Sequence, residues 1–378
     1  MRNLIGSLPS QIIREMIAAG YLLHGSEANI QPASLDLSIT DTVYRMKGTF
    51  LPRPGEKIDD FFSKGALYKA SLDYPLELNG IYLIKLREKC NLPEDIYAYT
   101  NNKSTTGRIN LQTRLIANGV SQFDHIPKGY KGDIWLEVVP KSFPIKLHAG
   151  AKLNQIRFFN GDTRLNRLEL EMIYDQYQIL FNKNGSPVPK QERYFMDNGI
   201  TMTVDLDSEI AGYKCIPSTN KYLDFKKEEE LNPTDFFEPI TRPKTGELYL
   251  KRDEFYILFT KEYLRVPPTF AGEMVAYDPS KGEYRSHYAG FFDPGFGYGK
   301  DGSVKGRPGV LEVFTHDNDF ILRDEQPICK MVFEKVLEIP DIIYGTDSAG
   351  SHYSAQLGPK LSRHFNMKQY ESIYQKAR

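Results

Sequence analysis

The sequence has few cysteines and no excess of either charge. Its three cysteines, Cys90, Cys215 and Cys329, stand far apart in 378 residues, so they form neither a CxxC pair nor a disulfide framework. Lysine and arginine total 48 against 49 acidic residues, a net charge of −1. This balance does not favour a nucleic acid polymer as partner, because such proteins usually carry a basic stripe. A small anionic substrate held by a few local cations is compatible with it.

Long apolar runs are also missing. No stretch of about 18 apolar residues occurs, and the chain starts without a basic segment leading into an apolar one. We therefore expect a soluble protein with no membrane partner, in the reducing cytoplasm. The length is sufficient for two domains of ordinary size.

Part of the sequence occurs twice with a nearly constant offset. Residues 82–88 match residues 256–262, and Trp-Leu-Glu-Val at 135–138 matches Val-Leu-Glu-Val at 310–313. A constant offset through apolar positions is difficult to obtain by chance. The repeat predicts a tandem duplication.

Each copy has the pattern of an all-β fold. Apolar segments such as 81–86, 134–139 and 153–159 have strand length and are separated by Gly, Pro, Asn and Asp. Helix is sparse: Ser10 can cap one amphipathic segment, which Gly20 ends.

The repeat and the turn signals place the domain boundaries. We expect a first domain over residues 1–162, a second over 163–344 and a tail over 345–378, with the turn at 160–162 between the copies. The charged run at 226–233 is interpreted as a solvated surface loop rather than a functional segment.

A polar segment after a predicted strand carries the first candidate site. It reads Lys103, Ser104, Thr105, Thr106, Gly107 and Arg108. Two cations around hydroxyls and a glycine suit a triphosphate, although an ordinary polar turn fits the composition equally well. The Walker A pattern is absent. The same place in the second copy, 278–282, lacks the arginine.

A hairpin in each copy carries the second candidate site. Asp124 and Asp293 lie at these hairpins, and a carboxylate there could bind a sugar hydroxyl. Glu137 and Glu312 follow, each inside an apolar strand. Each glutamate could simply point to solvent, but partial burial would raise its pKa toward the range that proton transfer needs.

The tail and the zinc motifs complete the search. Residues 351–364 are rich in small, aromatic and basic residues, which fits either a segment closing over an anion or a frayed terminus. The HxE and PCxxC elements of zinc-dependent deaminases do not occur in the sequence. We therefore expect no zinc chemistry.

Several of these segments together resemble the dCTP deaminase family of the trimeric dUTPase superfamily. Ile-Gln-Pro-Ala-Ser-Leu-Asp-Leu at 30–37 is similar to the family's IQPxSxDL element, and 103–108 resembles its RSSxxR motif with lysine in place of the first arginine. Residues 289–295 with Glu312 resemble the A-x-x-x-D-P-G hairpin and catalytic glutamate. The tail resembles the family's lid, and the likeness is closest to a two-domain bacterial branch.

The resemblance implies the fold and the reaction. It implies two dUTPase-like distorted β-barrels of jelly-roll type, and hydrolytic deamination of dCTP to dUTP and ammonia in pyrimidine deoxynucleotide synthesis. It further implies no tightly bound cofactor, Mg²⁺ arriving with the triphosphate, and a homo-oligomer, with a trimer favoured.

The resemblance also implies roles for residues. Ser104, Arg108 and a glutamate would be catalytic, with Glu312 as the preferred glutamate and Glu137 as the alternative. They would form a composite site built from both domains, of one chain or of two different chains. The expected substrate-binding residues are Lys103, Ser104, Thr105, Thr106, Gly107, Arg108, Asp124, Ala289, Asp293, Val310, Leu311, Tyr344, His352, Tyr353 and Gln356.

Two other functions stay open at this point. The shared fold and phosphate motif allow dUTP diphosphatase activity, alone or coupled to deamination. Loss of the second phosphate motif also allows a non-catalytic nucleotide-binding regulator.

Overall fold

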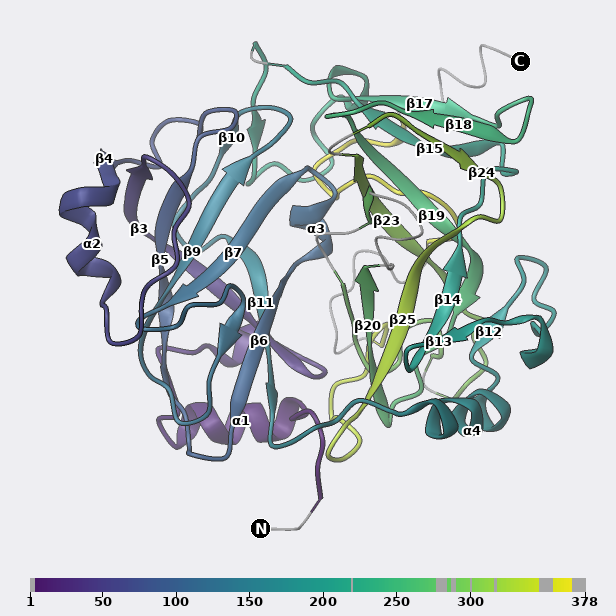
Figure 1. The fold of residues 1–378 in the computed structure, drawn as a ribbon, viewed down its shortest axis with the longest axis horizontal. Coiled ribbons are helices and arrows are strands. Elements are labelled where there is room, and N and C mark those ends of the chain that lie inside the picture. The colour runs from purple at the N-terminus through teal and green to yellow at the C-terminus, as the bar shows by residue number, and fades with distance from the viewer. Residues whose placement is uncertain are drawn as a thin grey trace.

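The computed structural model describes residues 4–218, 220–276, 284–286, 290–299, 301–315, 318–346 and 356–368. Strands dominate this part of the chain, and two β-rich units lie side by side, the first in purple and blue and the second in green and yellow (Figure 1). The fold is all-β, as the strand pattern of the sequence predicts.

Helices are short and few among the described residues. They are α1 (Ser10–Ala18), α2 (Ile58–Gly65), α3 (Ser104–Gly107) and α4 (Arg167–Tyr177), with single 3-10 turns at Glu27–Asn29, Lys190–Glu192 and Pro233–Asp235.

The first unit is built on one large sheet. Its strands are β1 (Leu22–Leu23), β2 (Ile30–Gln31), β3 (Ser34–Met46), β4 (Ala66–Ala70), β5 (Tyr82–Asn91), β6 (Tyr97–Asn102), β7 (Leu111–Ala117), β8 (His125–Ile126), β9 (Lys131–Pro140) and β11 (Lys152–Phe159). The order along the sheet is β7-β9-β5-β3-β11-β6-β8.

The second unit is divided between two larger sheets. The first has β12 (Leu180–Phe181), β15 (Ile210–Cys215), β17 (Phe237–Thr241), β19 (Phe255–Leu264), β21 (Tyr284–Ser286) and β23 (Arg307–Thr315). The second has β13 (Phe195–Met196), β14 (Gly199–Thr203), β20 (Phe270–Ala276), β22 (Phe291–Phe292) and β25 (Pro327–Lys335). A small separate pair joins β18 (Glu247–Leu250) to β24 (Phe320–Arg323).

Strand pairing confirms the duplication. In the first unit β5 pairs with β9 and places Leu83 opposite Glu137, and in the second β19 pairs with β23 and places Ile257 opposite Glu312. The neighbours of β11 are β3 and β6, and those of β25 are β14 and β20. Both glutamates therefore occupy the same place in the repeated ladder.

The beginning of α1 differs from the sequence expectation. Ser10 does not cap the helix: Pro9 holds the N-cap position, and the Ser10 hydroxyl donates to the Asp341 carboxylate instead. The helix end is as expected, because Gly20 follows it at a φ of +75°, where glycine meets no steric penalty. The distant partner Asp341 explains the error, since local sequence cannot reveal it.

The largest apolar core spans both units. Phe259 and Val310 from the second unit pack in one cluster with Phe143 and Ile145 from the first, and Phe365 of the tail joins them. A second cluster lies within the second unit. The two units thus meet over buried apolar surface, which fixes their relative position.

A short parallel pair also connects the units. Strand β10 (Ile145–Lys146) runs beside β16 (Leu223–Asp224). The charged run that follows is exposed over 226–230, as expected for a solvated loop. No helix in the described part of the chain is long and apolar enough to cross a membrane.

Candidate active site

The turn α3 lies at the junction of the two units, and residues of the 30–37 element hold its first end. Lys103 precedes it, and its ammonium group contacts the carboxylate of Asp36 on β3. Gln31 Nε2 donates to the same carboxylate at 3.3 Å. Thus Gln31 and Asp36 of the 30–37 element fix the start of α3, a role that the sequence reasoning did not assign.

A buried amide and hydroxyl network supports α3 from the sheet. Asn102 Nδ2 donates to the Leu111 carbonyl at 3.1 Å, and the Thr113 hydroxyl donates to Asn102 Oδ1. Asn154 Nδ2 donates to Thr113 Oγ1 at 3.2 Å. These bonds join the ends of β6 and β11 to β7 beside the turn.

Glu312 of the second unit lies directly against α3 of the first. A Cβ atom added at Gly107 would stand 2.4 Å from Glu312 Oε1 and 2.6 Å from its Cδ, closer than any real contact. Glu312 is buried on β23, on the face that also presents Val310 to the shared core. A larger residue at 107 would therefore displace this carboxylate or the turn.

The tail connects Arg108 to the second unit. Arg108 Nη2 donates to Gln356 Oε1 at 3.1 Å and Nη1 donates to the Lys360 carbonyl at 2.9 Å. Gln356 Nε2 in turn donates to the Pro308 carbonyl at 3.0 Å, just before Glu312 on β23. The Arg108, Glu312 and Gln356 side chains thus belong to one buried site inside a single chain.

The Asp-Pro-Gly hairpin of the second unit reaches the same junction. The Gly290 amide donates to Asn101 Oδ1 on β6 at 2.9 Å. Asp293 Oδ1 lies 3.4 Å from Arg157 Nη2, and burial raises the pKa of the Asp293 carboxyl. Gly295 has a φ of +97°, which the tight turn requires.

Relatives of this chain were identified by family models and by solved structures. The model of the N-terminal domain of 2′-deoxycytidine 5′-triphosphate deaminase matches residues 4–162, and the model of its C-terminal domain matches residues 175–365. The chain belongs to the dCTP deaminase family. A solved 2′-deoxycytidine 5′-triphosphate deaminase from Agrobacterium tumefaciens is 35% identical, with a TM-score of 0.80, over 90% of this chain and 100% of that one.

Curated relatives are more distant and cover less of this dCTP deaminase family member. "dCTP deaminase, dUMP-forming" of Methanobrevibacter smithii is 26% identical over 46% of this chain and 84% of its own length. A protein of the same name from Kocuria rhizophila is 30% identical over 35% of this chain and 67% of its own length. "dCTP deaminase" of Metallosphaera sedula is 24% identical over 35% of this chain and 71% of its own length.

Glu137 lies away from the junction in this family member. Its Oε2 accepts a bond from Thr49 Oγ1 at 2.5 Å, and burial raises the pKa of its carboxyl. The same sheet face presents Trp135, which packs edge-on against Phe62 of α2 at 5.1 Å. The first unit thus covers its own glutamate face with α2 and the segment leading to it, whereas α3 covers the equivalent face of the second unit.

The Asp124 carboxylate is also bonded within the first unit. Its carboxylate accepts bonds from the Leu115 amide at 2.8 Å and Thr100 Oγ1 at 3.1 Å, and Arg114 lies 3.6 Å away. Burial raises the pKa of Asp124 to about 6. Among the described residues, no hydrogen bond or ion pair joins Asp124 or Glu137 to α3, Glu312 or the tail.

The other predicted residues fall into three groups. Thr105, Thr106 and Gly107 are buried in α3, and Ser104 is its half-buried first residue. Val310 faces the shared core, the Leu311 side chain faces the opposite core, and Tyr344 packs beside the hairpin against Phe296 at 5.4 Å. Ala289, His352, Tyr353 and the 278–282 segment lie outside the described residues.

Arg157 is a site neighbour that sequence reasoning missed. It is fully buried on β11, donates to Glu334 Oε2 at 3.1 Å and lies 4.1 Å from the Phe291 ring centroid. The sequence does contain a sign of this role, because Arg157 stands in the middle of an apolar strand. A charge buried there needs a partner of opposite charge.

Proposed function

We propose that this chain deaminates dCTP by hydrolysis, releasing dUTP and ammonia. The observation that carries the proposal is the contact of the Glu312 carboxylate with the α3 turn at Gly107, since it unites a buried acid with the phosphate segment. Family membership supports the substrate class. The Arg108 contact with Gln356 supports a site closed by the tail.

The proposed roles follow from the chemistry of each group. Ser104, Lys103 and Arg108 bind the phosphates, and Ser104 and Arg108 position the attacking water. Glu312 takes a proton from that water, delivers it to N3 of the cytosine ring and assists the departure of ammonia from C4. The hairpin with Asp293, together with Tyr344, holds the nucleoside. Mg²⁺ arrives with the triphosphate as part of the substrate.

Glu312 is proposed as the catalytic carboxylate, with Glu137 as its matched control. Replacing Glu312 with glutamine removes the proton acceptor, so ammonia release from dCTP should fall about 100- to 10,000-fold. The Glu137→Gln change should leave most of the turnover, because Glu137 is buried against Thr49 in the first unit. The assignment would be rejected if the two variants showed the reverse pattern in a coupled ammonia assay.

A second candidate is a dUMP-forming reaction, in which dCTP is deaminated and also releases diphosphate. Two relatives carry that name, which is the observation in its favour. Measuring ammonia and diphosphate together, with dCTP and dUTP as separate substrates, separates the two products. Tight nucleotide binding without turnover of either would favour a regulator instead.

We infer that the reaction takes place in the cytoplasm. The three cysteines are free and buried, which suits a reducing compartment.

A further inference from the structure

A buried arginine of the first unit lies against the Asp-Pro-Gly hairpin of the second. Arg157 on β11 is fully buried, and its guanidinium group crosses the junction between the units. Its Nη1 donates to the Glu334 carboxylate on β25 at 3.1 Å and to the Gly272 carbonyl on β20 at 3.3 Å. Its Nη2 donates to the Phe292 carbonyl on β22 at 3.5 Å and to Asp293 Oδ1 at 3.4 Å. A single side chain of the first unit thus joins three neighbouring strands of the second.

Aromatic rings surround the same contact. The Arg157 guanidinium group lies 4.1 Å from the centroid of the Phe291 ring, and the Tyr99 ring on β6 lies 5.7 Å from that ring. The Tyr99 hydroxyl donates to the Glu334 carboxylate, which is fully buried as well. Because a buried charge is stable only when it is paired and hydrogen-bonded, these contacts hold Arg157 and Glu334 in one arrangement.

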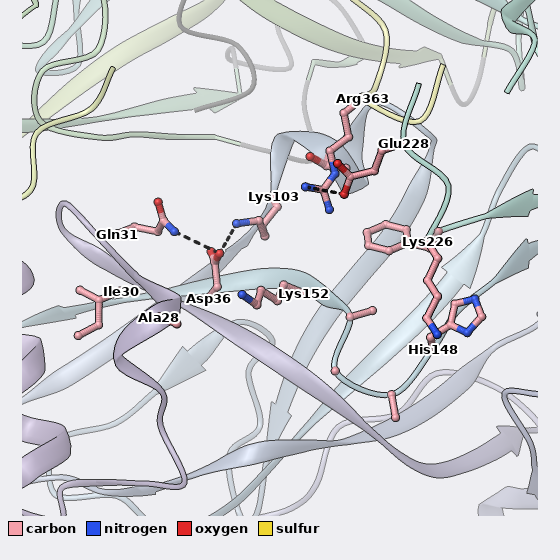
Figure 2. A pocket seen from close by; sticks show the side chains of 15 residues that line it. Ala28, Ile30, Gln31, Asp36, Lys103, His148, Lys152, Lys226, Glu228 and Arg363 are labelled. Carbon is pink, nitrogen blue, oxygen red and sulfur yellow. Dashed lines mark hydrogen bonds and ion pairs between the residues drawn. The ribbon is translucent and has the colours of Figure 1, made fainter. Parts of the chain in front are cut away.

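The other charges that act on Asp293 also belong to the first unit. They are Asp36 and Lys103, which contact each other as Figure 2 shows. Burial raises the pKa of the Asp293 carboxyl, and Arg157 opposes that shift more strongly than Lys103 does. Of these three groups, Arg157 is the one with a hydrogen bond to Asp293 in the described part of the chain. The direction in which the Asp293 carboxylate points is therefore set by Arg157.

We propose that Arg157 is a positioning residue, which orients the Asp293 carboxylate toward the sugar hydroxyl of the substrate. The inference rests on the proposed function, in which this hairpin holds the nucleoside. A carboxylate has two oxygens, so Asp293 can accept a bond from Arg157 on one and a bond from a hydroxyl on the other. In a deoxynucleoside triphosphate the 3′-hydroxyl is the only free sugar hydroxyl. Arg157 thus governs recognition of that hydroxyl from the neighbouring unit, through Asp293.

The test uses variants that remove both charges of a buried pair, because loss of Arg157 alone would leave Glu334 buried without its partner. Arg157→Met/Glu334→Gln replaces the pair by uncharged side chains of similar volume, which a buried position tolerates. The matched control is Arg193→Met/Glu262→Gln, since Arg193 Nη1 lies 2.5 Å from Glu262 Oε1 within the second unit. Among the described residues, no hydrogen bond or ion pair joins this control pair to the hairpin. Thermal melts show whether both double variants are folded.

The decisive measurement is calorimetric titration with dCTP and with 2′,3′-dideoxycytidine triphosphate, which lacks the 3′-hydroxyl. The unchanged chain should bind dCTP about tenfold more tightly or better, because the analogue loses a hydrogen bond to a charged group. Arg157→Met/Glu334→Gln should bind the two nucleotides about equally, whereas the control variant should keep the preference. The same preference in both double variants, or no preference in the unchanged chain, would overturn the proposal.

A cycle with Asp293→Asn shows whether Arg157 acts through Asp293. Asp293→Asn should remove most of the preference for dCTP, and adding Arg157→Met/Glu334→Gln to it should remove little more. Independent losses that add together would reject the positioning role, because Arg157 would then act by another route. All of these are binding measurements. Absence of turnover with every nucleotide would therefore reject the proposed function and leave the comparison of the two nucleotides valid.

Discussion

Gly107 is a residue at which the two units lie in close contact, and it provides a direct test of the site. Gly107→Ala places a methyl group 2.4 Å from Glu312 Oε1, so the carboxylate or the turn must move. A displacement of about 1 Å costs roughly 100-fold in rate, which we expect for ammonia release. Gly48→Ala is the control, because a Cβ there meets no atom within 4 Å.

A thermal melt shows whether the Gly107 effect is local. Gly107→Ala should lower the melting temperature, and Gly107→Ala/Glu312→Ala should recover it, because the second change removes the atoms in conflict. Full activity of Gly107→Ala would contradict the close approach.

At the residue scale the sequence identified both glutamates but did not separate them. Glu137 and Glu312 stand in the same Leu-Glu-Val context, and local sequence carries no sign of what covers each strand face. The difference comes from α2 over one face and α3 over the other, which are long-range contacts. Asp36 was quoted only as part of a motif, because its partner Lys103 lies far along the chain.

At the scale of elements, β11 of the first unit inserts a buried arginine among the carboxylates of β20 and β25. Arg157 contacts Glu334, Arg164 Nη2 lies 2.7 Å from Glu273 Oε2, and Asp293 is also near Arg157. Three acids therefore share two cations. Burial, and then the Glu334 carboxylate, raise the pKa of Glu273 above its ordinary value.

This raised pKa predicts a pH-dependent stability. The folded chain holds the Glu273 proton more tightly than the unfolded chain does, so the contribution is present at low pH and is lost as pH rises through the folded pKa. The melting temperature should fall between about pH 5 and pH 8, and Glu273→Gln should reduce that fall by about 2 °C or more. Glu15→Gln, an exposed change on α1, should leave the slope unaltered.

The elements themselves were largely predictable, but not their partners. Apolar segments of strand length predicted the long strands, and the repeated Leu-Glu-Val predicted the duplication. Helix α2 was not predicted. Its apolar residues Ile58, Phe61 and Phe62 pack in a cluster with Trp135 of a distant strand, and local sequence does not reveal that contact. The tail was ambiguous for the same reason: Leu361 and Phe365 pack into a core that both units supply.

At the scale of the whole molecule, the described contacts of the candidate site join residues of one chain. Gly107 with Glu312, and Arg108 with Gln356, are contacts inside a single copy. When chains with Ser104→Ala and chains with Glu312→Gln are co-expressed with different tags and purified together, we expect no recovery of turnover. Recovery would show that chains exchange halves of the site and would favour the threefold assembly, which stays a prediction together with the domain boundaries.

The contact between α3 and β23 also constrains the history of this chain. Under the proposed function, one unit supplies the turn that binds the phosphates and the other supplies the acid, so deleting or exchanging either unit would abolish the reaction. The same proposal implies that selection keeps the two units together, while the strand face that carries Glu137 beneath α2 is constrained by folding alone.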